Sequence, residues 1–207
     1  GPLPRFLKGL VMRTTLSTAG VAARAMLVFT VLLGVGYMLL ITAVGQVALP
    51  FQANGSLVRA ADDQVVGSQL LGQSFTDADG TALPQYFQSR PSAAGDGYDS
   101  AASSGSNRGP ENDDLIAAIE ERRSAFDALN GSGAIPADAV TASGSGLDPD
   151  ISVANAERQV ARVAEARGIP VSDVSALVAE HTLPRDLGYL GDPRVNVLEL
   201  NRALDAR

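Results

Sequence analysis

The hydrophobic and polar positions divide the chain into one long apolar stretch near the N-terminus and a mixed remainder. Residues 25–47 read AMLVFTVLLGVGYMLLITAVGQV, without a single charged side chain. As a helix rising about 1.5 Å per residue, this stretch is about 34 Å long, enough to cross a hydrocarbon core of about 30 Å. Pro50 follows and favours the end of a helix. The pattern predicts one transmembrane helix over residues 25–49.

Two other interpretations of this apolar stretch remain open. A core helix of a soluble domain is one, although such helices are usually shorter. A cleaved signal peptide is the other, because the small residues Ala43 and Gly45 follow the apolar run. The apolar part of a signal peptide is only about 7–15 residues long, which favours the membrane helix. Gly1-Pro2 is interpreted as a remnant of protease cleavage and is left out of the fold argument.

After the apolar stretch, short extended segments come first and helical periodicity follows. Residues 65–75 and the segment around Tyr86–Phe87 are expected to form short strands or extended pieces bounded by glycine and proline. Residues 89–112 are dense in Ser, Gly, Pro and Asn and predict a long loop, in which Arg90, Tyr98 and Arg108 offer specific contacts.

Four later segments show apolar residues at helical spacing. Their expected ends are Gly131, Gly168, a residue before Pro184, and Leu204. Their expected N-caps are Asn112 or Asp113, Ser152, Ser172, and Asn196 in a capping box with Glu199. Strands followed by helices predict an α+β fold for one domain spanning residues 51–207.

Charge is distributed unevenly along the chain. Residues 1–24 carry four basic side chains and no acid, whereas the other 183 residues carry twelve arginines and 23 acids, a net charge of −11. Because basic flanks stay in the cytoplasm, residues 1–24 are expected there and the acidic domain is expected outside. The chain is predicted to cross a membrane once, with its N-terminus inside.

Composition excludes several kinds of chemistry. The chain has no cysteine, one histidine (His181) and one lysine (Lys8). Disulfides, thiolate or histidine-cluster metal sites, cysteine nucleophiles and a Walker lysine are therefore ruled out. We assign no metal ligand and no catalytic residue.

Within the apolar stretch, Thr30, Gly34 and Gly36 are small residues that would let another membrane helix approach closely. Since glycine and threonine are common in membrane helices generally, a helix–helix interface is one of two interpretations. The other is that these residues have no partner.

Residues 141–149, reading TASGSGLDP, form the most unusual local string. It could be a tight structural turn or partner contact, a backbone nest for an anion, or part of a serine hydrolase site. In the last case Ser145 would be the nucleophile, His181 the base and Asp148 the residue that orients it. His181 at a helix end could equally cap the helix dipole. A membrane-anchored hydrolase or binding module is thus the alternative function.

Five strings in order resemble signatures of the KdpC family, the small accessory subunit of the bacterial Kdp potassium-transporting P-type ATPase. They are GSQLLGQ at 67–73 with Phe75, YFQSRPS at 86–92, SGSNRGP at 104–110, TASGSGLDP at 141–149, and LGYLGDPRVNV at 187–197 with Asn201. The sequence departs from the family pattern at Arg108, at Asp150, where the family often has histidine, and at Tyr189.

The resemblance implies an accessory, non-transporting subunit of a potassium import complex. The implied partners are a channel-like potassium-binding subunit, a P-type ATPase subunit, a small single-helix subunit and membrane lipid, with no nucleic acid. The residues expected to form the partner-contacting signature loops are Gln73, Arg90, Ser92, Ser106, Asn107, Ser143, Ser145, Asp148, Arg194 and Asn196.

The family has also been described as a catalytic chaperone that raises the nucleotide affinity of the ATPase subunit. The expected topology places Gln73, Ser143 and Ser145 on the side of the membrane opposite to ATP. We therefore expect no stably bound cofactor, with ATP a possibility by the family proposal only.

Overall fold

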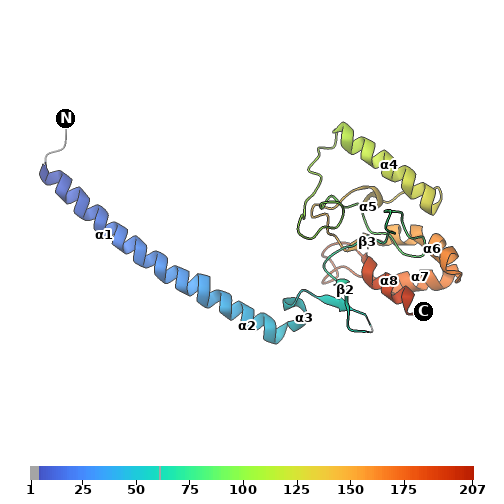
Figure 1. The fold of residues 1–207 in the computed structure, drawn as a ribbon, viewed down its shortest axis with the longest axis horizontal. Coiled ribbons are helices and arrows are strands. Elements are labelled where there is room, and N and C mark those ends of the chain that lie inside the picture. Colours follow the sequence, from blue (N-terminus) through green and yellow to red (C-terminus); the bar gives the residue numbers. More distant parts are fainter. Residues whose placement is uncertain (1–4, 61) are drawn as a thin grey trace. The chain divides into compact units, whose positions relative to one another are not determined.

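A computed structural model describes residues 5–60 and 62–207 (Figure 1). The interpretation of Gly1-Pro2 therefore lies outside the described residues. The chain divides into two compact units, residues 1–55 and 56–207. The second unit contains both sheets and the later helices, so the α+β prediction is confirmed.

The first unit is one long helical stretch whose middle is a π-helix. It comprises α1 (Arg5–Phe29), the π-helix η1 (Thr30–Tyr37) and α2 (Met38–Ala48). The part from Thr15 to Ala48 is long and apolar enough to cross a membrane, and none of its most apolar window is buried. The helix begins earlier than the apolar pattern indicates, because residues 5–24 are helical as well.

Leu49 ends this helix with φ −137° and ψ 55°. A residue before proline avoids the helical region, and Pro50 then opens the short helix α3 (Pro50–Ala53) at its first position.

Two small antiparallel sheets lie in the second unit. One pairs β1 (Leu57–Arg59) with β2 (Val65–Ser68). The other has the order β3–β5–β4, formed by Asp150–Ser152, Arg194–Asn196 and Thr182–Leu183. The register Ile151↔Val195 places both of these buried side chains at the centre of that sheet.

Five helices belong to the second unit: α4 (Asp113–Asn130), α5 (Ala137–Val140), α6 (Val153–Arg167), α7 (Val171–Glu180) and α8 (Val197–Asp205). Side chains of Asn112, Ser152 and Asn196 accept hydrogen bonds from the first turns of α4, α6 and α8, which confirms these three caps. The expected cap at Ser172 is wrong. Proline at 170 precedes α7 and the Ser172 hydroxyl donates to Asp173 instead.

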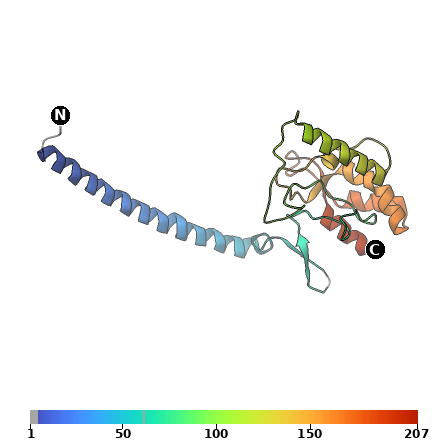
Figure 2. The same ribbon diagram turned by 45° about the horizontal axis from the view of Figure 1, so that its top comes forward.

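The hydrophobic core lies between the three-stranded sheet and helices α6, α7 and α8, which gather together in both views (Figures 1 and 2). Val163, Val174, Val195 and Leu200 are completely buried there. Helix α4 buries none of its residues fully and packs by one side only.

Of the two segments expected to be short strands or extended pieces, the first contains β2 over residues 65–68, and the one around Tyr86–Phe87 contains no strand. Two side-chain amides replace the missing neighbour strand. The Asn201 amide accepts from Phe87 N at 2.8 Å and donates to Phe87 O at 3.0 Å. Gln159 does the same for Gln88, accepting from N at 2.7 Å and donating to O at 3.1 Å. The backbone polar groups of Phe87 and Gln88 are thus satisfied without a sheet.

Replacing Asn201 by aspartate is therefore expected to destabilise the second unit by about 2 kcal/mol. A carboxylate can accept from Phe87 N but cannot donate to Phe87 O, which is left buried and unpaired. Urea unfolding of the full chain, followed by circular dichroism, measures the change. Asn107→Asp, at an exposed asparagine of the same unit, is the matched control, and equal losses in the two variants would contradict this account.

Candidate functional site

The signature strings meet in one place, where their backbones pack against each other. A Cβ built at Gly72 would lie 2.5 Å from Asp148 O and from a Tyr98 ring carbon. A Cβ at Gly146 would lie 2.7 Å from both Ala94 N and Ser104 O. Gly72 N donates to Leu147 O at 2.8 Å, and Ser104 N donates to Ser145 O at 3.0 Å. These glycines allow three loops to interlock at backbone distance.

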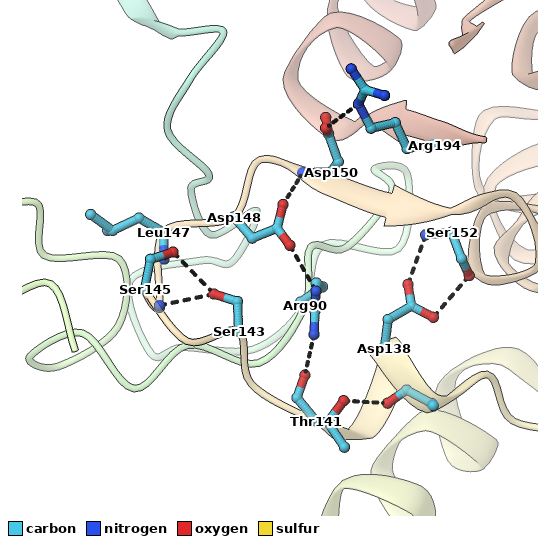
Figure 3. A network of polar contacts seen from close by, with 12 residues as sticks. Arg90, Asp138, Thr141, Ser143, Ser145, Leu147, Asp148, Asp150, Ser152 and Arg194 are labelled. Carbon is cyan, nitrogen blue, oxygen red and sulfur yellow. Dashed lines mark hydrogen bonds and ion pairs between the residues drawn. The ribbon is translucent and has the colours of Figure 1, made fainter. Parts of the chain in front are cut away.

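The serine hydroxyls of the 141–149 string bind their own loop (Figure 3). Ser143 Oγ accepts from Gly146 N at 2.9 Å, and Ser145 Oγ accepts from Leu147 N at 3.1 Å. The two hydroxyl oxygens are 3.2 Å apart and share a hydrogen bond. Because hydroxyls already occupy these two backbone amides, the geometry favours a structural turn over an anion nest.

Arg90 connects this loop to the 86–92 string. Its Nη1 lies 2.7 Å from Asp148 Oδ2, and its Nη2 lies 3.5 Å from Thr141 O. The Tyr98 hydroxyl donates to Arg90 O. Burial raises the pKa of Tyr98 to about 12, so the phenol remains a neutral donor at physiological pH. The Arg90–Asp148 ion pair is mostly shielded and holds the two strings in register.

A second ion pair lies beside the first, on the edge of the three-stranded sheet. Arg194 Nε is 3.0 Å from Asp150 Oδ2, and its Nη2 is 3.5 Å from Asp186 Oδ2. Asn196 donates to Asp150 Oδ1 and to Gln69 O. Asp150 and Arg194, together with Asp138 and Asp148, line an open pocket of about 520 Å³.

Burial raises the pKa of Asp150 above its ordinary value of 3.8, and the nearby Asp148 carboxylate adds to the effect against the opposing attraction of Arg194. The folded protein thus holds this proton more tightly than the unfolded chain. The contribution of Asp150 to stability therefore falls as pH rises from 3.8 through the raised pKa.

We expect Asp150→Asn to lose this dependence, so that its stability relative to wild type increases with pH across that mildly acidic window. Urea unfolding at closely spaced pH values measures the difference. Asp62→Asn, on an exposed side chain, controls for the removal of a single charge. A constant difference between Asp150→Asn and wild type would contradict the assignment.

The three residues of the hydrolase alternative each have other partners. Asp148 binds Arg90, and Ser145 binds Ser143 and Leu147. His181 lies at the C-cap of α7, where its Nδ1 is 3.0 Å from Leu177 O. This arrangement supports the helix-capping interpretation of His181 and provides no nucleophile–base hydrogen bond.

Other residues predicted for the signature loops occupy different positions. Ser92 Oγ donates to Gly146 O at 2.6 Å and accepts from Tyr98 N at 2.8 Å, so it belongs to the interlocked loops. The backbone carbonyl of Gln73 accepts a hydrogen bond from Ser89 Oγ at 2.9 Å. Ser106 and Asn107 are exposed, and Asn107 has a φ of 52°.

Three small residues predicted to face another helix, Thr30, Gly34 and Gly36, all lie in η1 and are exposed. A Cβ built at Gly34 would lie 3.7 Å from Cγ2 of Thr30 in the same helix. Their use as a helix–helix interface stays a prediction.

Sequence reasoning missed Asp138, which accepts from Ser152 N, Ser152 Oγ and Asn155 Nδ2. It joins α5 to the start of α6 (Figure 3). The only signal is its position two residues after Pro136, in the first turn of a short helix, which is too weak to identify a long-range contact.

The fold defines a class of protein in which one helix, long and apolar enough to cross a membrane, precedes a small α+β domain with interlocked loops. The family described as "KdpC: K+-transporting ATPase, c chain" matches residues 19–206. The potassium-transporting ATPase KdpC subunit of Caulobacter vibrioides is 60% identical over 179 residues, covering 86% of this chain and 88% of the relative.

The KdpC subunits of Beijerinckia indica and Mycobacterium tuberculosis are each 53% identical, over 185 and 187 residues. These alignments cover 88% and 89% of this chain, and 90% and 95% of the relatives. The chain belongs to the KdpC family, as the five signature strings indicated.

Proposed function

We propose that the chain is a non-catalytic accessory subunit that assembles and stabilises an ATP-driven potassium import complex. The family membership carries this proposal. The partners are a channel-like subunit, a P-type ATPase subunit and a small single-helix subunit. The helix up to Ala48 anchors the chain in the bacterial cell membrane, with residues 1–24 in the cytoplasm and the second unit outside.

The polar network supports an assembly role over a chemical one. Its serines, Arg90 and Asp148 are engaged with one another or with loop backbone. Such a network produces a rigid surface, which lowers the entropic cost of docking to a partner. Arg194 and the buried Asn196 would keep the loops in shape for the partner subunits.

The same contacts argue against direct ATP binding by this chain. Ser143 and Ser145 would have to give up hydrogen bonds to Gly146 N and Leu147 N in order to contact a phosphate. The expected topology also places them, together with Gln73, outside the cell. A chaperone effect on nucleotide affinity would then have to act through the membrane helix and its neighbours.

We expect the exposed acids of the second unit to raise the local cation concentration. The test replaces Asp62, Asp63 and Asp77 together by asparagine. Asparagine keeps a side-chain oxygen at positions 62 and 77, where the aspartates accept hydrogen bonds from nearby backbone amides. At low ionic strength, the potassium concentration for half-maximal uptake should be about twofold higher in the variant than in wild type. At high ionic strength the two proteins should have the same value, because salt shortens the screening length. An unchanged value at low ionic strength would contradict the steering effect.

Purification from native membranes through a C-terminal tag tests the proposed function. The expected result is co-purification of the channel-like and ATPase subunits, identified by mass spectrometry. A stable lone chain in mild detergent would support an anchored binding module instead and would overturn the proposal.

A further inference from the structure

The turn of residues 185–193, between β4 and β5, presents exposed apolar side chains. Within the described part of the second unit, Leu187 at 81% and Tyr189 at 69% exposure are the most exposed large apolar residues, and Leu190 is 47% exposed. Proteins usually reserve a group of exposed apolar side chains on one short segment for contact with a partner.

This turn is held in one shape. Asp186 N donates to Leu190 O and Leu190 N donates to Asp186 O, both at 2.9 Å. Arg185 Nη2 lies 2.7 Å from Asp192 Oδ1 and closes the base of the turn. Leu187 has a φ of 53°, in the left-handed region that a leucine seldom adopts. Strain of this kind persists where the surrounding structure imposes the conformation.

The turn is also tied to the sheet. Arg194, on β5, reaches back to Asp186 at 3.5 Å and across to Asp150 on β3 at 3.0 Å. Arg185, in the turn, and Arg194, directly after it on β5, are therefore both paired with aspartates, and little positive charge remains to attract an anionic headgroup.

We infer that Leu187, Tyr189 and Leu190 form a rigid apolar tip that inserts into an apolar socket on a polypeptide subunit of the same complex. The inference rests on the proposed function. A fixed, strained shape lowers the entropic cost of filling a socket of matching shape, but it brings no advantage in fluid lipid. Large aromatic and aliphatic anchors in desolvated pockets dominate the binding energy of interfaces. The charge pairing and the fixed shape together favour a protein socket over the membrane surface.

The test uses the full chain co-expressed with its complex, with Tyr189 replaced by the photo-crosslinking residue benzoylphenylalanine. Irradiation of native membranes should yield a covalent adduct with another subunit, identified by mass spectrometry. The same residue placed at Val171, which is 53% exposed on α7, is the matched control and should give at least tenfold less adduct.

A second variant separates apolar contact from folding. Leu187→Asn introduces a residue that adopts the left-handed region readily, so the shape of the turn and the unfolding midpoint should be unchanged. The adduct at position 189 should nevertheless fall about tenfold.

Three outcomes would overturn the inference. They are adducts with lipid only, no adduct while the subunits still co-purify, and an adduct that Leu187→Asn leaves undiminished. In each case the proposed function would stand if the complex co-purifies through the C-terminal tag. Failure of wild type to co-purify would overturn both.

Discussion

Replacing Arg162 by methionine is expected to destabilise the second unit by about 4 kcal/mol, the largest effect of any single substitution considered. The Arg162 side chain lies on α6, and the residue is only 9% exposed. Its Nη1 donates to Pro84 O and to Tyr86 O, the latter at 2.9 Å. Methionine would fill much of the volume but leave Pro84 O without its donor, and Tyr86 O would keep only the 3.3 Å hydrogen bond from Gln88 Nε2.

The same guanidinium reaches two side chains. Nε donates to Asn130 Oδ1 at 2.9 Å and Nη2 to Gln159 Oε1 at 2.7 Å. Arg162 thus connects the end of α4, helix α6 and the turn at residues 84–86. Burial lowers its pKa to about 10, so it stays protonated at neutral pH and the network does not titrate there.

Chemical unfolding of the full chain measures the loss. Arg162→Lys should lose roughly half as much, because one ammonium can reach only some of the four oxygens. Arg123→Met, at an exposed position on α4, is the control and should change stability by less than about 0.5 kcal/mol. If Arg162→Met unfolds at the same urea concentration as Arg123→Met, the structural role assigned to Arg162 is wrong.

Gly146→Ala is expected to lower the free energy of unfolding of the second unit by about 3 kcal/mol and to disrupt assembly of the complex. Gly146 has a φ of 68°, which alanine adopts only with strain, and the new methyl would lie 2.7 Å from two backbone atoms of other loops. The interlocked loops would have to separate.

Gly144, two residues earlier in the same string, is the matched control. Its Cβ would meet nothing within 4 Å, so Gly144→Ala should fold and assemble as wild type does. Unfolding midpoints and recovery of the tagged complex provide the comparison. Equal behaviour of the two variants would show that the signature loop does not depend on close backbone packing.

Local features of the fold were readable from the sequence, whereas its long-range contacts were not. The caps at Asn112, Ser152 and Asn196 depend on residues within one helical turn, and all three are present. The pattern around Tyr86–Phe87 did not decide between a strand and an extended piece, because the partners of this backbone, Asn201 and Gln159, are side chains far along the sequence.

The candidate site shows the same division. The unusual composition of the 141–149 string marked it as special, and one of its three interpretations, the structural turn, fits the geometry. Neither the Arg90–Asp148 pair, 58 positions apart, nor the fit of Gly72 against Tyr98 has a local signal. Contacts of this kind depend on how the loops fold together, which spacing and composition do not encode directly.

The most direct test of the proposed role is to determine on which side of the membrane the second unit lies. Protease added to intact spheroplasts should cleave this unit, and a membrane-impermeant label supplied from the cytosolic side of inverted vesicles should not reach it. Protection from external protease together with labelling from the cytosolic side would contradict the account, and would make a direct role beside the nucleotide-binding part of the ATPase subunit plausible.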